Sequence, residues 1–353
     1  MTAVVCDVAV VGAGLAGLIC ARMLTEAGLS VQVFDKSKGT GGRMATRRGE
    51  EMSFDHGAQY FTVRHPAFAR QLIEWEQQGL VAPWTSPVVA LHEGKVTPSP
   101  SQIRYVGTPG MSGLCRGLSQ TLALNPGHRL IQLERTDGRW WLHFDAGSHV
   151  LADAVVMAIP APLALPLLHR RTPLAAQLAR VAMDPCWALM LLPQRKLGLE
   201  FGGAFVDDPR INWIACNSSK PGRHGLEAWV VHATPEWSRT HLDATPDTVA
   251  SLLHAAFETA IGRRVTPLLL KPHRWRHAKT SISLGVDYLL DHEARLGICG
   301  DWCRGSRVED AFLSGRQVAT QLLAAHSSLI QGVAAGVRTG VNRITPLRGS
   351  SLS

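Results

Sequence analysis

The chain has 353 residues, of which 46% are hydrophobic and 18% are charged, and its formal net charge is +8. This length allows two domains with a large core, and the composition is that of a globular protein. No run of about eighteen uncharged apolar residues occurs and no basic segment precedes the first apolar run, so we expect a cytoplasmic protein that does not interact with membranes.

Cysteines and basic residues are scattered along the chain. The seven cysteines include no Cys-x-x-Cys pair, so we predict neither a disulfide framework nor a metal site. The basic residues do not gather into a recognition helix or an RNA-binding platform, which argues against a nucleic-acid partner. A small anionic substrate and an arginine-rich solvated surface both explain the positive charge.

The first predicted unit is a strand, a glycine-rich turn, a helix and a second strand. Its elements are expected at residues 8–11, 15–27 and 31–34. In the turn, Gly12 allows a sharp bend, Gly14 lets a pyrophosphate approach the backbone, and Gly17 allows close packing of helix on strand. Asp35 ends the second strand, where a carboxylate can bind the hydroxyls of an adenosine ribose. This pattern predicts a dinucleotide site, and a chance run of glycines would not explain both strands and the helix.

Further along the chain the pattern changes twice. Residues 36–43 form a basic, glycine-rich segment that could close over the pyrophosphate, and residues 54–61 form a compact turn with polar and aromatic groups. A hairpin is predicted at Asp137-Gly138, because this pair favours the tight turn between two strands. From about residue 170 to 270, short strands suggest an antiparallel sheet. The strands and helices expected after residue 60 are 66–78 and 111–122 (helices), 129–135, 140–144, 154–159, 187–192, 203–206, 213–216 and 228–232 (strands), 246–261 (helix) and 268–275 (strand).

The last predicted unit is a short strand that ends in Gly300-Asp301, followed by a helix at about 310–324. Residues 327–353 are rich in serine, glycine and arginine and contain no acid. We expect a mostly disordered tail there.

Gly300-Asp301 resembles the second fingerprint of flavin oxidoreductases, in which a strand-end aspartate binds the ribityl or pyrophosphate part of FAD. With residues 12–17 and 41–43, this pair makes the chain similar to the amine-oxidase-like flavoproteins. The runs GAQYFT (57–62), PGMS (109–112) and GDWC (300–303) resemble the bacterial renalases more specifically. This resemblance covers about residues 5 to 325.

The resemblance implies noncovalent FAD and oxidation of dihydronicotinamide isomers of NAD(P)H to NAD(P)+. In that family the hydride passes to flavin N5 and O2 reoxidises the flavin to give H2O2. Bacterial members favour the 1,2-dihydro isomer, and the 1,6-dihydro isomer is left open. Such a substrate already carries its hydride and leaves as an aromatic cation, so no general base is required and we predict no catalytic side chain.

Cofactor and substrate residues follow from the matched motifs. For FAD we predict contacts from Gly12, Ala13, Gly14, Gly17, Asp35, Lys36, Gly42, Arg43, Gly57, Ala58, Gln59, Leu130, Asp301, Val308 and Ala311. For the substrate we predict aromatic walls, polar contacts and phosphate-binding arginines from Tyr60, Phe61, Arg64, Cys186, Trp187, Asn217, His232, Trp275, Arg276, Trp302 and Arg307. Except for Tyr60, which lies in a matched motif, each of these aromatics has a simpler explanation as a core residue. Glu309 and Asp310 are explained by the dipole of the last helix and are not predicted to be catalytic.

The predicted fold class is α/β, with a Rossmann-type FAD-binding domain built from separate segments and a substrate domain with a mixed or antiparallel sheet. We assign 1–79, 106–165 and 276–326 to the first domain, and 80–105 and 166–275 to the second. Two alternatives remain: a flavin amine oxidase or desaturase-like dehydrogenase, and an FAD-binding regulator that uses its basic tail. The oligomeric state, the preference for NAD or NADP, and oxidase against dehydrogenase behaviour are open.

Overall fold

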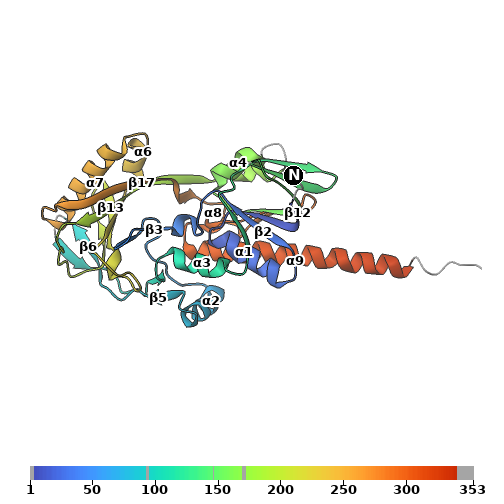
Figure 1. Cartoon of the computed structure of the whole chain (residues 1–353), viewed down its shortest axis with the longest axis horizontal. Helices are drawn as coiled ribbons and strands as arrows, with labels where there is room; N and C mark the ends of the chain where they lie inside the picture. The colour runs from blue at the N-terminus through green and yellow to red at the C-terminus, as the bar shows by residue number, and fades with distance from the viewer. Residues whose placement is uncertain (1–3, 93–94, 146, 169–171, 340–353) are drawn as a thin grey trace, which may run out of the picture.

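The computed structural model describes residues 4–92, 95–145, 147–168 and 172–339. Two large sheets lie side by side, and each is covered by its own helices (Figure 1). The fold is mixed α/β with a Rossmann-like first half, which confirms the predicted fold class.

The first sheet has eight strands in the order β10-β11-β12-β1-β2-β9, with β19 paired to β12 and β18 to β19. Strands β2, β12 and their neighbours β9 and β19 run parallel to β1, as in a nucleotide-binding sheet. The strands are β1 (Val4–Val11), β2 (Val31–Asp35), β9 (Ala123–Pro126), β10 (Leu130–Thr136), β11 (Arg139–Phe144), β12 (His149–Met157), β18 (Leu289–Asp291) and β19 (Leu296–Ile298).

Helices α1 and α9 pack on one face of this sheet. Leu18 of α1 and Val318 of α9 are fully buried in the same apolar cluster as Val10 of β1. The helices around this sheet are α1 (Leu15–Glu26), α2 (Pro66–Gln77), α3 (Ser112–Ser119), α4 (Ala161–Leu168), α5 (Ala175–Leu178), α8 (Asp301–Arg304) and α9 (Val308–Thr339).

Helix α9 is longer than predicted and extends away from the body of the molecule (Figure 1). It continues to Thr339, so the expectation of disorder is wrong for residues 327–339. This stretch contains no proline and several good helix formers, which lets the helix continue. Residues 340–353 of the predicted tail lie outside the described part of the chain.

The second sheet has seven strands in the order β17-β13-β16-β15-β14-β6-β7. Neighbouring strands are antiparallel except β14 and β6. The strands are β6 (Val88–His92), β7 (Lys95–Pro98), β13 (Ala182–Pro193), β14 (Gly203–Val206), β15 (Ile211–Cys216), β16 (Trp229–Ala233) and β17 (Pro267–Ile282), and the helices of this half are α6 (Pro235–Thr240) and α7 (Pro246–Ile261).

The two faces of the second sheet have different partners. Helix α7 covers one face, where Leu253 and Phe257 pack against Trp229. The other face meets the first half of the molecule: Phe54 packs against Met190 there. Short elements line this junction, namely η1 (Gly42–Met44), β3 (Thr46–Arg48), β4 (Ser53–Asp55), β5 (Val81–Pro83), β8 (Tyr105–Gly107) and η2 (Asn217–Ser219). The division at residues 80, 106, 166 and 276 stays a prediction, and β17 continues past the last of these points.

Candidate functional site

The turn between β1 and α1, residues 12–17, is packed tightly against its neighbours at Gly12 and Gly17 and is open at Gly14. We call this turn the cofactor cradle. Gly12 has φ +114°, and a Cβ there would lie 2.5 Å from the carbonyl oxygen of Ala158. A Cβ on Gly17 would collide with the carbonyl oxygen of Gly12, whereas a Cβ on Gly14 would meet nothing within 4 Å. The glycines at 12 and 17 therefore allow close packing, and the space at Gly14 is left for a ligand.

Helix α1 begins at this cradle with no side chain capping its N-terminus. The neighbouring N–H of Ala13 donates to Oδ2 of Asp35 over 2.7 Å, and Oδ1 of Asp35 accepts the N–H of Ser37, also at 2.7 Å. The carboxylate of Asp35 is thus fixed beside the cradle. Uncapped N–H groups at a helix start bind phosphate well, because they are unpaired and lie at the positive end of the helix dipole.

Two distant segments complete the cradle. The N–H of Gly41 donates to the carbonyl oxygen of Ala13 over 2.9 Å, which places the second glycine-rich loop beside the first. Arg43 in that loop forms a two-pronged ion pair with Asp301, with N···O distances of 2.9 and 2.5 Å across 258 residues of sequence. The N–H of Ala58 donates to the carbonyl oxygen of Arg43 over 2.8 Å. The predicted cofactor residues at 12–17, 41–43, 57–58 and 301 therefore come together.

Other predicted cofactor residues lie at the edges of this assembly. Lys36 is exposed just after β2, and Leu130 is buried at the start of β10, near the hydrogen bond from the N–H of His128 to the carbonyl oxygen of Asp35. Val308 and Ala311 are in the first turn of α9 and are partly buried. These positions suit the ends of an extended dinucleotide, and the individual contacts stay predictions.

The first-turn acids of α9 are occupied by structural hydrogen bonds. Glu309 is buried and accepts the N–H groups of Arg64 and His65 at 2.8 and 2.7 Å. Asp310 accepts the N–H of Arg307 at 3.1 Å. Both carboxylates therefore fix the backbone around the helix start.

Facing the cradle, a row of side chains crosses the second sheet. His273 of β17 is opposite Ala188 of β13, Ala188 is opposite His232 of β16, and His232 is opposite Trp213 of β15. Directly opposed residues share a face of the sheet, so these side chains form one surface. It is the surface that meets the turn of residues 54–61, because His273 contacts His56 with ring centroids 4.6 Å apart.

His56 contacts His232, His273 and Trp275, and we call these four residues the His56 group. The carbonyl oxygen of His56 accepts Nε1–H of Trp275 at 2.9 Å and Nε2–H of His232 at 3.3 Å. The ring of His56 is stacked on Trp275 with centroids 5.1 Å apart. Burial lowers the pKa of His56, His232 and His273 to about 4, so all three imidazoles are neutral at neutral pH.

A buried charged group lies next to the same turn, and we call it the Asp55 cluster. Oδ2 of Asp55 accepts from Arg223 at 2.5 Å and from Lys220 at 3.4 Å, and Oδ1 accepts the N–H of Met111 at 2.9 Å. Lys220 also donates to the side-chain oxygens of Gln59 and Asn217, both at 3.1 Å. Burial opposes ionisation of Asp55, but the two cations outweigh it and lower the pKa of Asp55 to about 2. Burial lowers the pKa of Lys220 to about 8.

The predicted substrate residues fall into three groups. Tyr60, His232 and Trp275 line the junction, and Cys186 is opposite Trp275 across the strand pair of β13 and β17. Phe61, Trp187 and Trp302 are buried in apolar clusters, and Asn217 belongs to the Asp55 cluster. Arg276 lies 3.8 Å from Asp243, while Arg64 and Arg307 are exposed. The sheet register places Cys186, His232 and Trp275 on one face of the second sheet, and Tyr60 contacts that face through Trp213.

Several residues at the junction were not singled out from the sequence. Asp55 and His56 lie inside the DHGAQYF run, and Lys220 and Arg223 occupy one turn after β15. A lysine and an arginine in a short segment between two buried strands are the only sequence signal for this cluster. Nothing in the sequence pairs them with Asp55, which lies 165 and 168 residues earlier.

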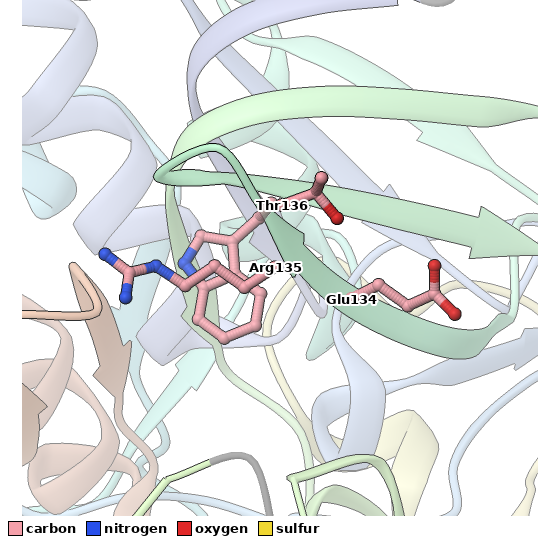
Figure 2. A pocket seen from close by; sticks show the side chains of 4 residues that line it. Glu134, Arg135 and Thr136 are labelled. Carbon is pink, nitrogen blue, oxygen red and sulfur yellow. The ribbon is translucent and has the colours of Figure 1, made fainter.

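One cavity lies elsewhere in the molecule and offers no comparable set of groups. It measures about 370 Å³ and is lined by Glu134, Arg135, Thr136 and Trp140 on the β10–β11 hairpin. Figure 2 shows the side chains of Glu134 and Arg135 pointing in opposite directions. Arg135 donates to the carbonyl oxygen of Glu293 over 2.7 Å. Among the described residues, no group of three or more His, Cys, Asp or Glu side chains could hold a metal ion.

Comparison with known proteins agrees with this geometry. Residues 10–73 match the NAD(P)-binding Rossmann-like domain, and residues 76–323 match the flavin containing amine oxidoreductase family. Renalase from Mus musculus is 27% identical over 306 residues, covering 78% of this chain and 86% of that protein. A putrescine oxidase bound to putrescine has a similar fold, with a TM-score of 0.72, 12% identity, and coverage of 92% of this chain and all of the other. In the described part of the chain, no helix has both the length and the apolar character needed to cross a membrane.

Proposed function

Because the chain belongs to the flavin containing amine oxidoreductase family and is similar to renalase, we propose that it oxidises dihydronicotinamide isomers of NAD(P)H to NAD(P)+ with O2 as the final acceptor. The broader activity, that of an FAD-dependent oxidoreductase, is given by the family. The finer assignment rests on the junction described above.

The residues present fit FAD. The open space at Gly14, the uncapped start of α1 and the carboxylate of Asp35 suit its pyrophosphate and ribose, and the Arg43–Asp301 pair lies where the resemblance puts the rest of the cofactor. When bound, FAD supplies a hydride acceptor. Cys303 is fully buried, and burial raises the pKa of its thiol to about 12, which supports noncovalent binding.

The observation that carries the proposal is the neutral character of the His56 group. A dihydronicotinamide is a flat, uncharged ring that becomes a cation when it loses its hydride. Neutral imidazole and indole faces can hold such a ring and do not repel the cation that forms. No proton has to be removed from the substrate, so the absence of a free carboxylate in this group, within the described residues, fits the reaction.

The amine-oxidase alternative is favoured by the family name and by the fold shared with putrescine oxidase. Aromatic faces such as those of the His56 group attract a protonated amine as well. Asp55 is already engaged by Lys220 and Arg223, so it is not available to form an ion pair with an ammonium group. The dihydronicotinamide is favoured because it needs no such ion pair, and the next experiment separates the two substrates.

Anaerobic mixing of the FAD-loaded protein with 1,2-dihydro-NAD(P) tests the proposal. We expect the visible absorbance of the oxidised flavin to disappear within one turnover and to return, with formation of H2O2, when air is admitted. Putrescine under the same conditions should leave the flavin oxidised. Bleaching by the amine and not by the dihydronicotinamide would replace the proposal with the amine-oxidase alternative.

A further inference from the structure

Next to the His56 group, four aromatic and basic side chains form what we call the Tyr60 cluster. It consists of Tyr60, Trp84, Arg104 and Trp213. The ring of Tyr60 lies 5.3 Å from that of Trp213 and 6.3 Å from that of Trp84, and the guanidinium of Arg104 lies 5.3 Å from the Tyr60 ring. Tyr60 is half-buried, so the cluster reaches the surface beside this residue.

Positive charge is in excess where this cluster meets the Asp55 cluster. Arg104, Lys220 and Arg223 are 7%, 2% and 6% exposed. Nζ of Lys220 lies 5.5 Å from the Trp84 ring, and Arg223 donates to the carbonyl oxygen of Gly107 over 2.6 Å, so the three cations surround one junction. Asp55 is the one carboxylate that pairs with any of them among the described residues.

Three buried N–H groups here have no partner among the described residues. They are Nε of Arg104, Nε of Arg223 and Nε1 of Trp213. A buried cation and an unpaired buried donor each destabilise the folded protein unless a partner is supplied. All three groups are donors, so the missing partner is an acceptor, and the excess of positive charge makes that acceptor an anion.

We propose that Arg104, Arg223 and the indole N–H of Trp213 bind the diphosphate of the substrate dinucleotide beside Tyr60. This inference rests on the proposed function, which supplies a substrate with a diphosphate. It is an alternative to Arg64 and Arg307, the phosphate ligands expected from the sequence, whose side chains are both exposed. The aromatic rings of the cluster would hold a sugar or base of the same substrate.

The test compares substrates that have and lack the diphosphate. FAD-loaded protein is reduced with 1,2-dihydro-NAD and with the corresponding dihydronicotinamide riboside, and the binding of ADP-ribose is measured by titration. Arg104→Met should raise the KM for the dinucleotide and the Kd for ADP-ribose about tenfold or more, the effect of one lost charged hydrogen bond. The kcat for the dinucleotide and the KM for the riboside should be unchanged.

Two further variants keep the outcome interpretable. Trp213→Phe removes the N–H donor and keeps an aromatic ring, so a selective loss of ADP-ribose binding in this variant supports the site even if Arg104→Met fails to fold. Arg64→Met is the exposed comparison and should change both constants by less than about fivefold, well below the effect of Arg104→Met. The inference is overturned if Arg104→Met and Trp213→Phe weaken the riboside and the dinucleotide equally, or if only Arg64→Met has the selective effect. If neither substrate reduces the flavin while ADP-ribose still binds with the predicted dependence on Arg104, the proposed function has failed and the anion site stands.

Discussion

The cofactor cradle and the Asp55 cluster differ in whether their polar groups already have hydrogen-bond partners. In the cradle, backbone N–H groups at the start of α1 have no side-chain cap, and the Gly14 side is open. In the cluster, Asp55 accepts bonds from Thr46, Met111, Lys220 and Arg223. The free N–H groups of the cradle can bind a ligand, whereas the fully bonded carboxylate of Asp55 holds two parts of the chain together. Polar residues near a site should therefore be sorted by whether their bonds are already made.

The largest effect on stability should come from removing the charge of Asp55. Asp55→Asn leaves Lys220 and Arg223 buried without a counter-charge, and we expect a loss of about 3 to 5 kcal/mol in the free energy of unfolding. Urea unfolding of the FAD-loaded protein measures it. Asp207→Asn, at an exposed hydrogen bond with His92, is the control and should cost less than about 1 kcal/mol. A loss of similar size in both variants would contradict the role given to Asp55.

A smaller effect, on FAD binding, is expected from a substitution in the cofactor cradle. Asp35→Ala removes the acceptor of the Ala13 N–H and the predicted ribose ligand, so FAD binding should weaken by roughly 1 to 3 kcal/mol. The flavin content after gel filtration reports the loss. Asp7→Ala is a close control, because Oδ2 of Asp7 accepts the N–H of Ser30 at 2.7 Å away from the cradle. A fully flavinated Asp35 variant would remove this residue from the cofactor site.

Acid should weaken the junction, because the fold holds three of its imidazoles neutral. The pKa of His56, His232 and His273 is about 4 in the folded protein and about 6.5 in an unfolded chain. Between these values the unfolded chain binds more protons, so stability is full above pH 6.5 and falls as the pH drops toward 4, by at most about 1.4 kcal/mol per pH unit for each histidine.

Urea unfolding at pH 7 and pH 5 checks this slope. His232→Asn should make the stability less dependent on pH, because one of the three groups no longer titrates. The exposed His224→Asn variant should keep the slope of the parent protein. An unchanged slope in the His232 variant would mean that this imidazole is not held neutral by the fold.

The smallest effect is expected for Arg64→Ala. The side chain is exposed, and only its backbone N–H has a structural bond, to Glu309. An exposed charge contributes about 1 kcal/mol at most, so flavin reduction at low substrate should slow by less than about fivefold with unchanged FAD content. Stopped-flow reduction at several substrate concentrations measures the change. A larger change than that of Arg104→Met would move the phosphate site to the surface.

The cradle could be predicted because its chemistry is local. Gly12, Gly14, Gly17 and Asp35 lie in one strand–helix–strand unit, and the spacing alone gives the geometry. The helix at 246–261 was predicted with its bounds, since its apolar spacing and the glycine after it are local signals as well.

The junction could not be predicted in the same way. Arg104, Trp213 and Arg223 approach Tyr60 only because strands far apart in sequence pair in one register. Trp187 and Trp275 show the difficulty: both were expected to face the substrate, but Trp187 lies on the α7 face of the second sheet and Trp275 on the junction face. Short strands of mixed composition do not reveal which face meets which partner.

The pairing of Arg43 with Asp301 also determines when the nucleotide-binding half can finish folding during synthesis. Arg43 is made early, and its partner follows 258 residues later, after both strands of the hairpin and the whole second sheet. Strand β19 and helix α9, which finish the first sheet and its cover, also come from the end of the chain. A ribosome-bound chain therefore cannot close its nucleotide half until Asp301, β19 and α9 have emerged, so the complete cofactor cradle forms only after the second sheet has been made.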